Sequence, residues 1–447
     1  MILLTFIVVL ALCVAALYAH DVRQKEHSIL RNFPVIGHFR YLLEDLGVYL
    51  RQYWFAADRE ELPFNRAERA WVYRAAKGDD TTVGFGSTRD LRPVGTVMFV
   101  DAPFPVLGED ACETRPLIIG PYCKHPYETH SVFNISAMSY GAISKNAVQA
   151  LAQGAKMGGC WLNTGEGGVS SYHLDAECDL VAQIGTAKYG FCDIHGKLSD
   201  EALRGTALYP QIKMFELKLS QGAKPGKGGI LPGVKVTPEI AAIRFIRPHQ
   251  DSISPNRHPE IANVSQLMDM IEHIRAVTGK PVGFKTVLGS YEWLDHLCQE
   301  ILKRGIENAP DFITLDGAEG GTGAAPASLI DYMGLPILES LPALVDILVE
   351  YGLRDRIKVI ASGKLITPAE VAWALCAGAD FVASARGFAF ALGCIQALKC
   401  HTNNCPTGIT THQEHLVAGL DPSNKATRVA SYVKSMLYEV GVISHSC

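Results

Sequence analysis

The sequence predicts an α/β protein built around a closed (β/α)₈ barrel. From about Gly95 onward, short apolar, β-branched runs end in glycine or polar residues, and helical stretches follow most of them. Strands that alternate with helices imply a parallel sheet. Eight such units in roughly 300 residues fit one closed barrel. An open doubly wound sheet is the alternative, but no G-x-G-x-x-G follows a first strand.

The expected strands can be placed from these apolar runs. They are Val132–Met138, Cys160–Asn163, Leu180–Gly185, Met214–Leu219, Val282–Val287, Phe312–Asp316, Lys358–Ala361 and Phe381–Ala385. The expected helices include Lys145–Lys156, Ser199–Tyr209, Pro238–Ile246, Tyr291–Gly305, Leu341–Tyr351 and Pro368–Ala377.

Composition narrows the class of protein. Of the 447 residues, 48% are hydrophobic and 19% are charged, which indicates a well-buried globular chain. The net charge of −5 provides no broad basic surface, so we expect no nucleic-acid partner. Twelve cysteines in so long a chain do not form a disulfide scaffold, and most of them are scattered singly, which suits a reducing compartment.

The N-terminal segment Met1–Ala19 is apolar apart from Thr5 and is predicted to be an uncleaved transmembrane anchor. At 1.5 Å per residue, a helix of this length reaches just under the roughly 30 Å hydrocarbon core. A cleaved signal peptide is the alternative, but no positive charge precedes the run. Basic residues follow it, so the positive-inside rule places the body in the cytoplasm. We therefore expect a single-pass protein of the inner (cytoplasmic) membrane.

Four regions are expected. The anchor, residues 1–19, is followed by a connecting arm at 20–94, the barrel at 95–425 and a C-terminal helix and tail at 426–447. Within the arm, Ile36–Phe55 has helical apolar spacing and many aromatic residues. We expect it to pack on the main domain, with a position on the membrane surface as the alternative. Lys77–Val94 is expected to be a loop.

Polar and glycine residues follow nearly every expected strand. In such barrels the active site is formed by the residues after the strands. The candidates, in strand order, are Ser136, Met138 and Ser139; Asn163 and Glu166; Gln183; Lys218; Lys285; Asp316, Gly317, Gly320, Gly321 and Thr322; Ser362, Gly363 and Lys364; and Arg386 and Gly387.

The last two of these turns fit a phosphate site. Barrels often bind phosphate with the loops after strands seven and eight. Gly363 and Gly387 would let backbone amides approach, and Arg386 could add a bidentate contact. With inward lysines, this arrangement suits flavin mononucleotide (FMN). Lys285 is placed to stabilise the reduced flavin near its N1–C2=O edge, and we expect Lys218 to act at the same site.

Three cysteines lie close together near the C-terminus. Cys394, Cys400 and Cys405 have C-x₅-C-x₄-C spacing and Pro406 after the last one. Such spacing can hold an iron–sulfur cluster, while zinc usually has four ligands at shorter spacing. Ordinary buried thiols are the alternative.

Five segments resemble the FMN-binding synthase domain of glutamate synthase. They are ISAMSYGAIS, NTGEGG, LSQGAKPGKGGILPG, DGAEGGTGAAP and GCIQALKCHTNNCPTGITTHQ, in the same order over roughly Ser131 to Gln413. The resemblance implies a (β/α)₈ barrel that holds FMN next to a 3Fe–4S cluster with the three cysteines as ligands. It also implies reduction of 2-iminoglutarate, formed from 2-oxoglutarate and ammonia, by hydride from reduced FMN.

Other domains of the large family enzymes have no recognisable counterpart in this sequence. We identify no glutaminase domain, no C-terminal β-helix domain and no NAD-binding module. Ammonia is therefore expected from solution or from a separate glutaminase subunit, and electrons from ferredoxin, another protein or a membrane carrier.

By the same resemblance, Lys224 and Arg244 match the anchors for the 2-oxoglutarate carboxylates, and Glu166 matches a glutamate near the ammonia entry point. Arginine suits carboxylates because its planar fork makes two parallel hydrogen bonds. At Ile230 the family has a glutamine, so one substrate contact is lost. Two hypotheses follow: an oxidoreductase acting on a 2-oxo acid imine, or a membrane-tethered electron-transfer subunit without amino-acid synthesis.

Overall fold

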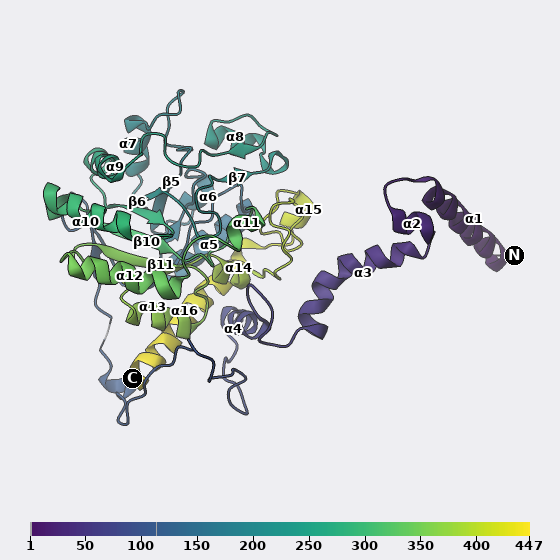
Figure 1. Ribbon diagram of the computed structural model, residues 1–447, viewed down its shortest axis with the longest axis horizontal. Coiled ribbons are helices and arrows are strands. Elements are labelled where there is room, and N and C mark those ends of the chain that lie inside the picture. Colours follow the sequence, from purple (N-terminus) through teal and green to yellow (C-terminus); the bar gives the residue numbers. More distant parts are fainter. Residues whose placement is uncertain (1, 113) are drawn as a thin grey trace. The chain divides into compact units, whose positions relative to one another are not determined.

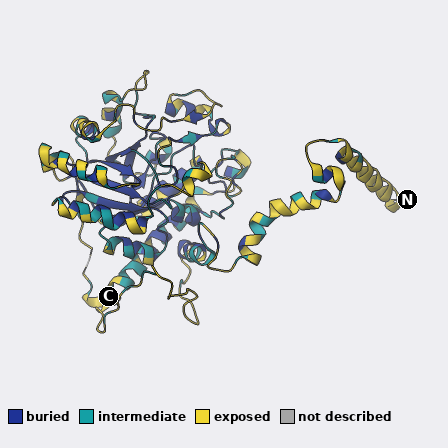
Figure 2. Ribbon diagram, in the orientation of Figure 1, coloured by how far each residue is buried: buried dark blue, intermediate teal, exposed yellow. Residues whose placement is uncertain are grey.

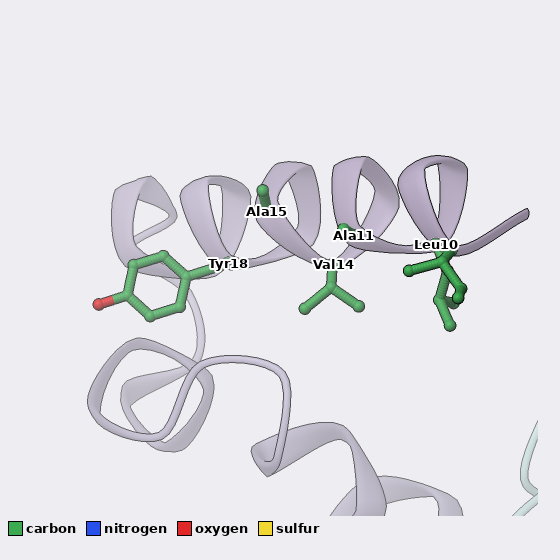
Figure 3. A pocket seen from close by; sticks show the side chains of 6 residues that line it. Leu10, Ala11, Val14, Ala15 and Tyr18 are labelled. Atoms are coloured by element: carbon green, nitrogen blue, oxygen red, sulfur yellow. The ribbon is translucent and has the colours of Figure 1, made fainter. Parts of the chain in front are cut away.

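The computed structural model describes residues 2–112 and 114–447, and the chain divides into two compact units, Met1–Ala67 and Glu68–Cys447 (Figure 1). The first unit contains α1 (Ile2–Arg23), α2 (Ser28–Asn32), α3 (Gly37–Leu50) and the π-helical turn η1 (Arg51–Phe55). By length and composition, α1 could cross a membrane. One of its faces is a wholly non-ionic surface lined by Leu10, Ala11, Val14, Ala15 and Tyr18 (Figure 3).

A buried carboxylate joins α1 to α3 within the first unit. Asp21, in the last turns of α1, is fully buried. It accepts hydrogen bonds from the Val35 backbone N–H at 2.8 Å and from His38 Nε2 at 3.0 Å. These bonds fix the end of α1 against the start of α3, because a buried carboxylate must find such partners.

The second unit is a closed barrel of eight parallel strands, which confirms the predicted fold. The strand order is β10-β11-β12-β3-β4-β5-β6-β9, and β9 pairs with β10 to close the ring. The strands are β3 (Phe133–Ile135), β4 (Leu162–Asn163), β5 (Leu180–Ile184), β6 (Ile212–Lys218), β9 (Val282–Thr286), β10 (Phe312–Asp316), β11 (Lys358–Ser362) and β12 (Phe381–Ser384).

Each predicted strand coincides with one of these, although β3 and β4 are shorter than predicted. All residues of β3, β4, β5, β9, β10 and β12 are buried, because helices cover the outside of the barrel and side chains fill its inside (Figure 2).

The predicted helices are also present. The helices of this unit are α4 (Arg66–Lys77, which begins just before it), α5 (Lys145–Gly158), α6 (Ser171–Leu174), α7 (Asp200–Ala207), α8 (Pro238–Arg244), α9 (Val264–Thr278), α10 (Glu292–Arg304), α11 (Ala327–Ile330), α12 (Ile337–Glu350), α13 (Pro368–Cys376), α14 (Arg386–Leu392), α15 (Glu414–Val417) and α16 (Pro422–Ser446). Helix α16 packs on α5, α13 and α14, so it takes part in the outer ring of the barrel.

Small elements close the barrel at its two ends. At the amino ends of the strands lies the hairpin β1 (Leu117–Ile119) and β2 (Tyr127–Thr129), whose Ile119 and Tyr127 join the core. At the carboxyl ends, β7 (Ile230–Leu231) pairs with β8 (Ser252–Ile253). Three 3₁₀ turns, η2 (Gly108–Asp110), η3 (Gly233–Lys235) and η4 (Ile306–Asn308), complete the elements.

Candidate functional site

The barrel brings the predicted strand-end residues to one edge, because the carboxyl ends of parallel strands in a barrel all meet there. Contacts between neighbouring ends confirm this proximity. Ser136 N donates to Ser384 O at 3.0 Å, and Gly222 N donates to the Asp316 carboxylate at 2.9 Å. Gln221 Nε2 donates to Gly321 O at 3.0 Å. Hydrogen bonds thus join the end of β3 to the end of β12, and the turn after β6 to the end of β10.

The ends of β10, β11 and β12 form a glycine-lined corner. A Cβ on Gly363 would lie 2.8 Å from Gly317 N, and one on Gly321 would lie 2.8 Å from Arg386 Cδ. Gly363 also has φ of 121°, which disfavours a side chain. Arg386 is half-buried; loss of water around its guanidinium lowers its pKa to about 10, and it donates to Glu319 O. A charged guanidinium beside bare backbone fits a phosphate.

Lys285 and Asp316 face each other at the ends of β9 and β10. Lys285 Nζ lies 3.4 Å from Asp316 Oδ2, and both side chains are less than a tenth exposed. Lys285 also lines a cavity of about 10 Å³ at the barrel axis, together with Ser136, Asn163 and other residues. A cation there meets the requirement for stabilising a reduced, anionic flavin.

An ion pair between Glu166 and Lys218 joins the loop after β4 to the end of β6, where Lys218 pairs with Lys285 of the neighbouring β9. Lys218 Nζ lies 2.7 Å from Glu166 Oε1 and 2.6 Å from Gln221 Oε1. Burial raises the pKa of Glu166, but the charges of Lys218, Lys224 and Arg244 outweigh it and hold that pKa at about 2. The carboxylate is therefore ionised at neutral pH and surrounded by three cations.

Lys224 and Arg244 are buried beside this carboxylate. Lys224 is 4% exposed, and burial lowers its pKa to about 8. The Arg244 guanidinium lies over the Tyr189 ring and donates through Nη2 to Tyr140 O at 3.1 Å. Its Nε is buried and has no protein partner. Two cations in excess over one carboxylate favour a dianionic ligand.

Ile230 lies next to these charges along the chain. It belongs to β7, where it pairs with Ile253. A Cβ on the preceding Gly229 would lie 2.6 Å from Glu166 Oε1. The backbone just before Ile230 therefore passes close to the Glu166 carboxylate.

The three cysteines lie in the loop between α14 and α15. The thiols of Cys400 and Cys405 both raise the pKa of Cys394, and that of Cys405 raises the pKa of Cys400, so the three lie near one another. Burial raises the pKa of Cys394 to about 12. Among the described residues, no three His, Cys, Asp or Glu side chains are grouped closely enough to hold a metal ion. The cluster therefore stays a prediction.

The cysteine loop is joined to the loop after β3. His412 Nε2 lies 2.8 Å from Gly141 O, and Ser144 Oγ donates to Gly408 O at 2.7 Å. The buried Lys235 donates to both Ala142 O and Cys400 O. The loop that carries Met138 and Ser139 is thus held against the cysteines.

Sequence reasoning missed three residues of this region. Glu216 lies inside β6, while Tyr189 and Lys235 lie in turns. Glu216 had a detectable signal: it is an acidic residue within an otherwise apolar run, two positions before Lys218. Tyr189 and Lys235 carry no pattern of their own.

A closed barrel with cations and glycine turns at the carboxyl ends of its strands is typical of barrel enzymes that bind a cofactor. The family model described as the conserved region in glutamate synthase matches residues 109–446, and the chain therefore belongs to the glutamate synthase family. This membership makes it an oxidoreductase that acts on CH–NH₂ groups.

Two relatives show the range of similarity. A glutamate synthase large subunit-like protein of Bacillus subtilis is 42% identical, over 94% of this chain and 87% of that protein. The archaeal glutamate synthase [NADPH] of Methanocaldococcus jannaschii is 35% identical over 68% of this chain, which spans 57% of that relative. Among solved structures, a mandelate oxidase variant aligns with a TM-score of 0.46 at 12% identity, over 85% of this chain and 86% of that one.

The mouth fits FMN, as the family suggests. A Cβ added to Gly321 would lie 2.8 Å from Arg386 Cδ and Nε, so this glycine keeps the space beside the guanidinium free of a side chain. Lys285 supplies the buried cation and Gln183 a buried amide. The donor set therefore suits both a phosphate and a flavin ring.

Proposed function

We propose that this chain reduces the imine of a dicarboxylic 2-oxo acid, 2-iminoglutarate or a close relative of it, to an amino acid. The observation that carries the proposal is the grouping of Lys218, Lys224 and Arg244 around the single carboxylate of Glu166. Lys224 and Arg244 neutralise the two substrate carboxylates, and each charge-assisted contact is worth about 1.5–3 kcal/mol.

The residues at the mouth have separate roles in this proposal. FMN, when bound, supplies the hydride. Arg386 and the glycine corner hold its phosphate, and Lys285 stabilises negative charge on the ring. Lys218 and the neighbouring cations hold Glu166 ionised, so its carboxylate can bind ammonium and guide it to the site. Cys394, Cys400 and Cys405 would hold a 3Fe–4S cluster on the adjoining loop.

Supply of electrons and ammonia completes the proposal. Electrons come from a donor protein or a membrane carrier, and ammonia from solution or a separate glutaminase subunit. Helix α1 anchors the chain in the inner membrane with the barrel on the cytoplasmic side. The exposed apolar side chains along α1 support this position.

The test follows flavin reoxidation under anaerobic conditions, with 2-oxo acids and ammonium as acceptors. The parent should be reoxidised by 2-oxoglutarate or a related acid. Arg244→Ala should lower the apparent affinity on the order of ten- to a hundredfold. Exposed Arg247 lies three residues further on, so Arg247→Ala is the matched control and should behave as the parent.

Ile230 favours the second candidate, a flavin and iron–sulfur electron-transfer subunit without amino-acid synthesis, because it removes a substrate contact. If the imine reaction is used, Ile230→Gln should improve turnover of 2-oxoglutarate with ammonium, since it adds one hydrogen bond. If Arg244→Ala is reoxidised as fast as the parent by every 2-oxo acid tried, the electron-transfer function becomes the better explanation.

A further inference from the structure

A second carboxylate, Glu216, lies inside the barrel below the mouth. It is 1% exposed and lines the small axial cavity together with Asn163, Lys285 and Thr314. It lies within β6, two residues before Lys218, and the proposed chemistry above does not use it. A buried carboxylate must be compensated by hydrogen bonds or a partner charge, so its surroundings are informative.

Three neutral groups donate to Glu216. Its Oε1 accepts from Asn163 Nδ2 at 2.8 Å and from Gln183 Nε2 at 2.7 Å. Its Oε2 accepts from Thr314 Oγ1. An ionised carboxylate has no hydrogen to donate. Both amides must therefore turn their NH₂ groups toward Glu216 and their oxygen atoms away from it.

The orientation of Asn163 determines a turn at the mouth. Its Oδ1 accepts from Gly165 N at 3.0 Å. Gly165 has φ of 68° and passes so close to the next loop that a Cβ there would lie 2.5 Å from Ser139 N. Glu216 thus fixes the path of the β4 turn through Asn163.

The orientation of Gln183 determines what the site offers to a ligand. Because Nε2 is held by Glu216, the amide presents its oxygen, which is an acceptor. The oxidised flavin ring has one N–H, at N3, between two carbonyl groups. An acceptor therefore suits the ring, whereas a reversed amide would place NH₂ against N–H.

We propose that Glu216 is a positioning residue for the flavin: it locks the amide of Gln183 so that an acceptor faces the N–H of the ring. This proposal rests on the FMN binding proposed above. A purely structural role, in which Glu216 supports the barrel core, is the alternative that the experiment must separate.

The first variant is Glu216→Gln. Asn163 and Gln183 both donate to Glu216 in the parent, but the new glutamine has only one oxygen acceptor and presents an NH₂ group in place of the other. Gln183 can then reverse. We expect the dissociation constant for FMN to rise about tenfold, as for loss of a hydrogen bond of this kind. We also expect the flavin reduction potential to rise, because a negative charge near the ring is removed.

The double variant Gln183→Glu/Glu216→Gln exchanges the two groups and keeps a donor opposite an acceptor. It should restore FMN affinity toward that of the parent, because an oxygen faces the ring again. Its carboxylate now adjoins the flavin, so the reduction potential should fall below the parent value. If Glu216 only supports the barrel core, the double variant should recover its FMN affinity while its flavin reduction potential stays at the parent value.

Thr314→Val is the matched control, because it removes the third donor to Glu216 and leaves both amides bound. It should lower the urea midpoint while FMN affinity and potential stay at the parent values. The proposal is overturned if Glu216→Gln binds FMN with parental affinity and potential. A parent protein that binds no flavin would instead overturn the proposed function itself.

Discussion

At the scale of single residues, Lys224 gives the site a defined pH dependence. Burial lowers its pKa to about 8, so the ammonium form is progressively lost above that pH. A substrate carboxylate needs the charged form, and its apparent affinity should therefore fall as pH rises through about 8. Glu166, with a pKa of about 2, stays ionised throughout this range.

The variant Lys224→Arg tests this assignment, because arginine stays protonated well above pH 8. The apparent KM for the 2-oxo acid in the parent should rise between pH 7 and 9, and in the variant it should stay flat. Flavin reoxidation rates against acceptor concentration supply the measurement. An equal rise in both proteins would show that another group titrates.

Sequence patterns predicted individual residues well where a residue follows a strand. Asp316, Gly363 and Arg386 lie where the barrel repeat placed them, because strand ends converge by topology. Glu216 was missed because its partners Asn163 and Gln183 come from other strands. A single sequence does not show which side chains meet across a barrel axis.

At the scale of elements, the contact of α5 with α16 depends on a glycine. A Cβ on Gly154 would overlap the side chain of Val429 and lie 2.9 Å from Ala426 O. Ala in place of Gly improves helix propensity by about 1 kcal/mol, while overpacking costs about 1–3 kcal/mol. The crowding should win, so Gly154→Ala should lower the free energy of unfolding by about 1 kcal/mol.

Gly205 provides the comparison for that prediction. It lies in α7, and a Cβ there meets nothing within 4 Å. Gly205→Ala should therefore stabilise the protein by up to about 1 kcal/mol. Urea unfolding of both variants tests the pair. If both stabilise, α16 is free to move away from α5.

The loop that carries the three cysteines allows a second prediction at this scale, which concerns its iron content. If Cys394, Cys400 and Cys405 hold a 3Fe–4S cluster, anaerobically purified protein should carry about three irons per chain. Cys400→Ser should lose them, because a hydroxyl is a poor ligand for this cluster. Iron analysis and the broad visible absorbance are the readouts. Zinc in place of iron would contradict the assignment.

Element boundaries were predicted to within a few residues for most strands and helices. The β7–β8 pair was not predicted, because two-residue strands carry no periodicity. Helix α16 begins at Pro422, and its contact with α5 joins residues far apart in the sequence. Such long-range packing follows from the closed barrel rather than from any local pattern.

At the scale of the whole molecule, the N-terminal helix should determine where the protein resides. Deletion of residues 1–19 should move the protein from the membrane fraction to the soluble fraction, with FMN still bound, since the barrel buries its own core. Fractionation with flavin absorbance measures both. Cleavage after Ala19 in the mature protein would support a signal peptide instead.

Acid stability is the last property of the whole molecule to consider, and it depends on buried histidines. Burial lowers the pKa of each of His173, His258 and His412 to about 4. Unfolded histidine titrates near 6.5, so the unfolded chain binds more protons between about pH 6.5 and 4. Stability should therefore be complete above this window and fall as pH drops through it, by roughly 1–3 kcal/mol for each histidine.

His173 offers a direct test, because its side chain is fully buried. Its Nδ1 accepts from Ser170 N at 3.1 Å, a bond that a glutamine oxygen can replace. His173→Gln should therefore reduce the loss of the urea midpoint between pH 7 and 5, while exposed His195→Gln should leave it unchanged. An unchanged loss in His173→Gln would mean that His173 already carries a proton in the folded protein. Glu166 does not affect this comparison. Its pKa is lowered to about 2, so its contribution to the free energy of unfolding is lost only below pH 4.5.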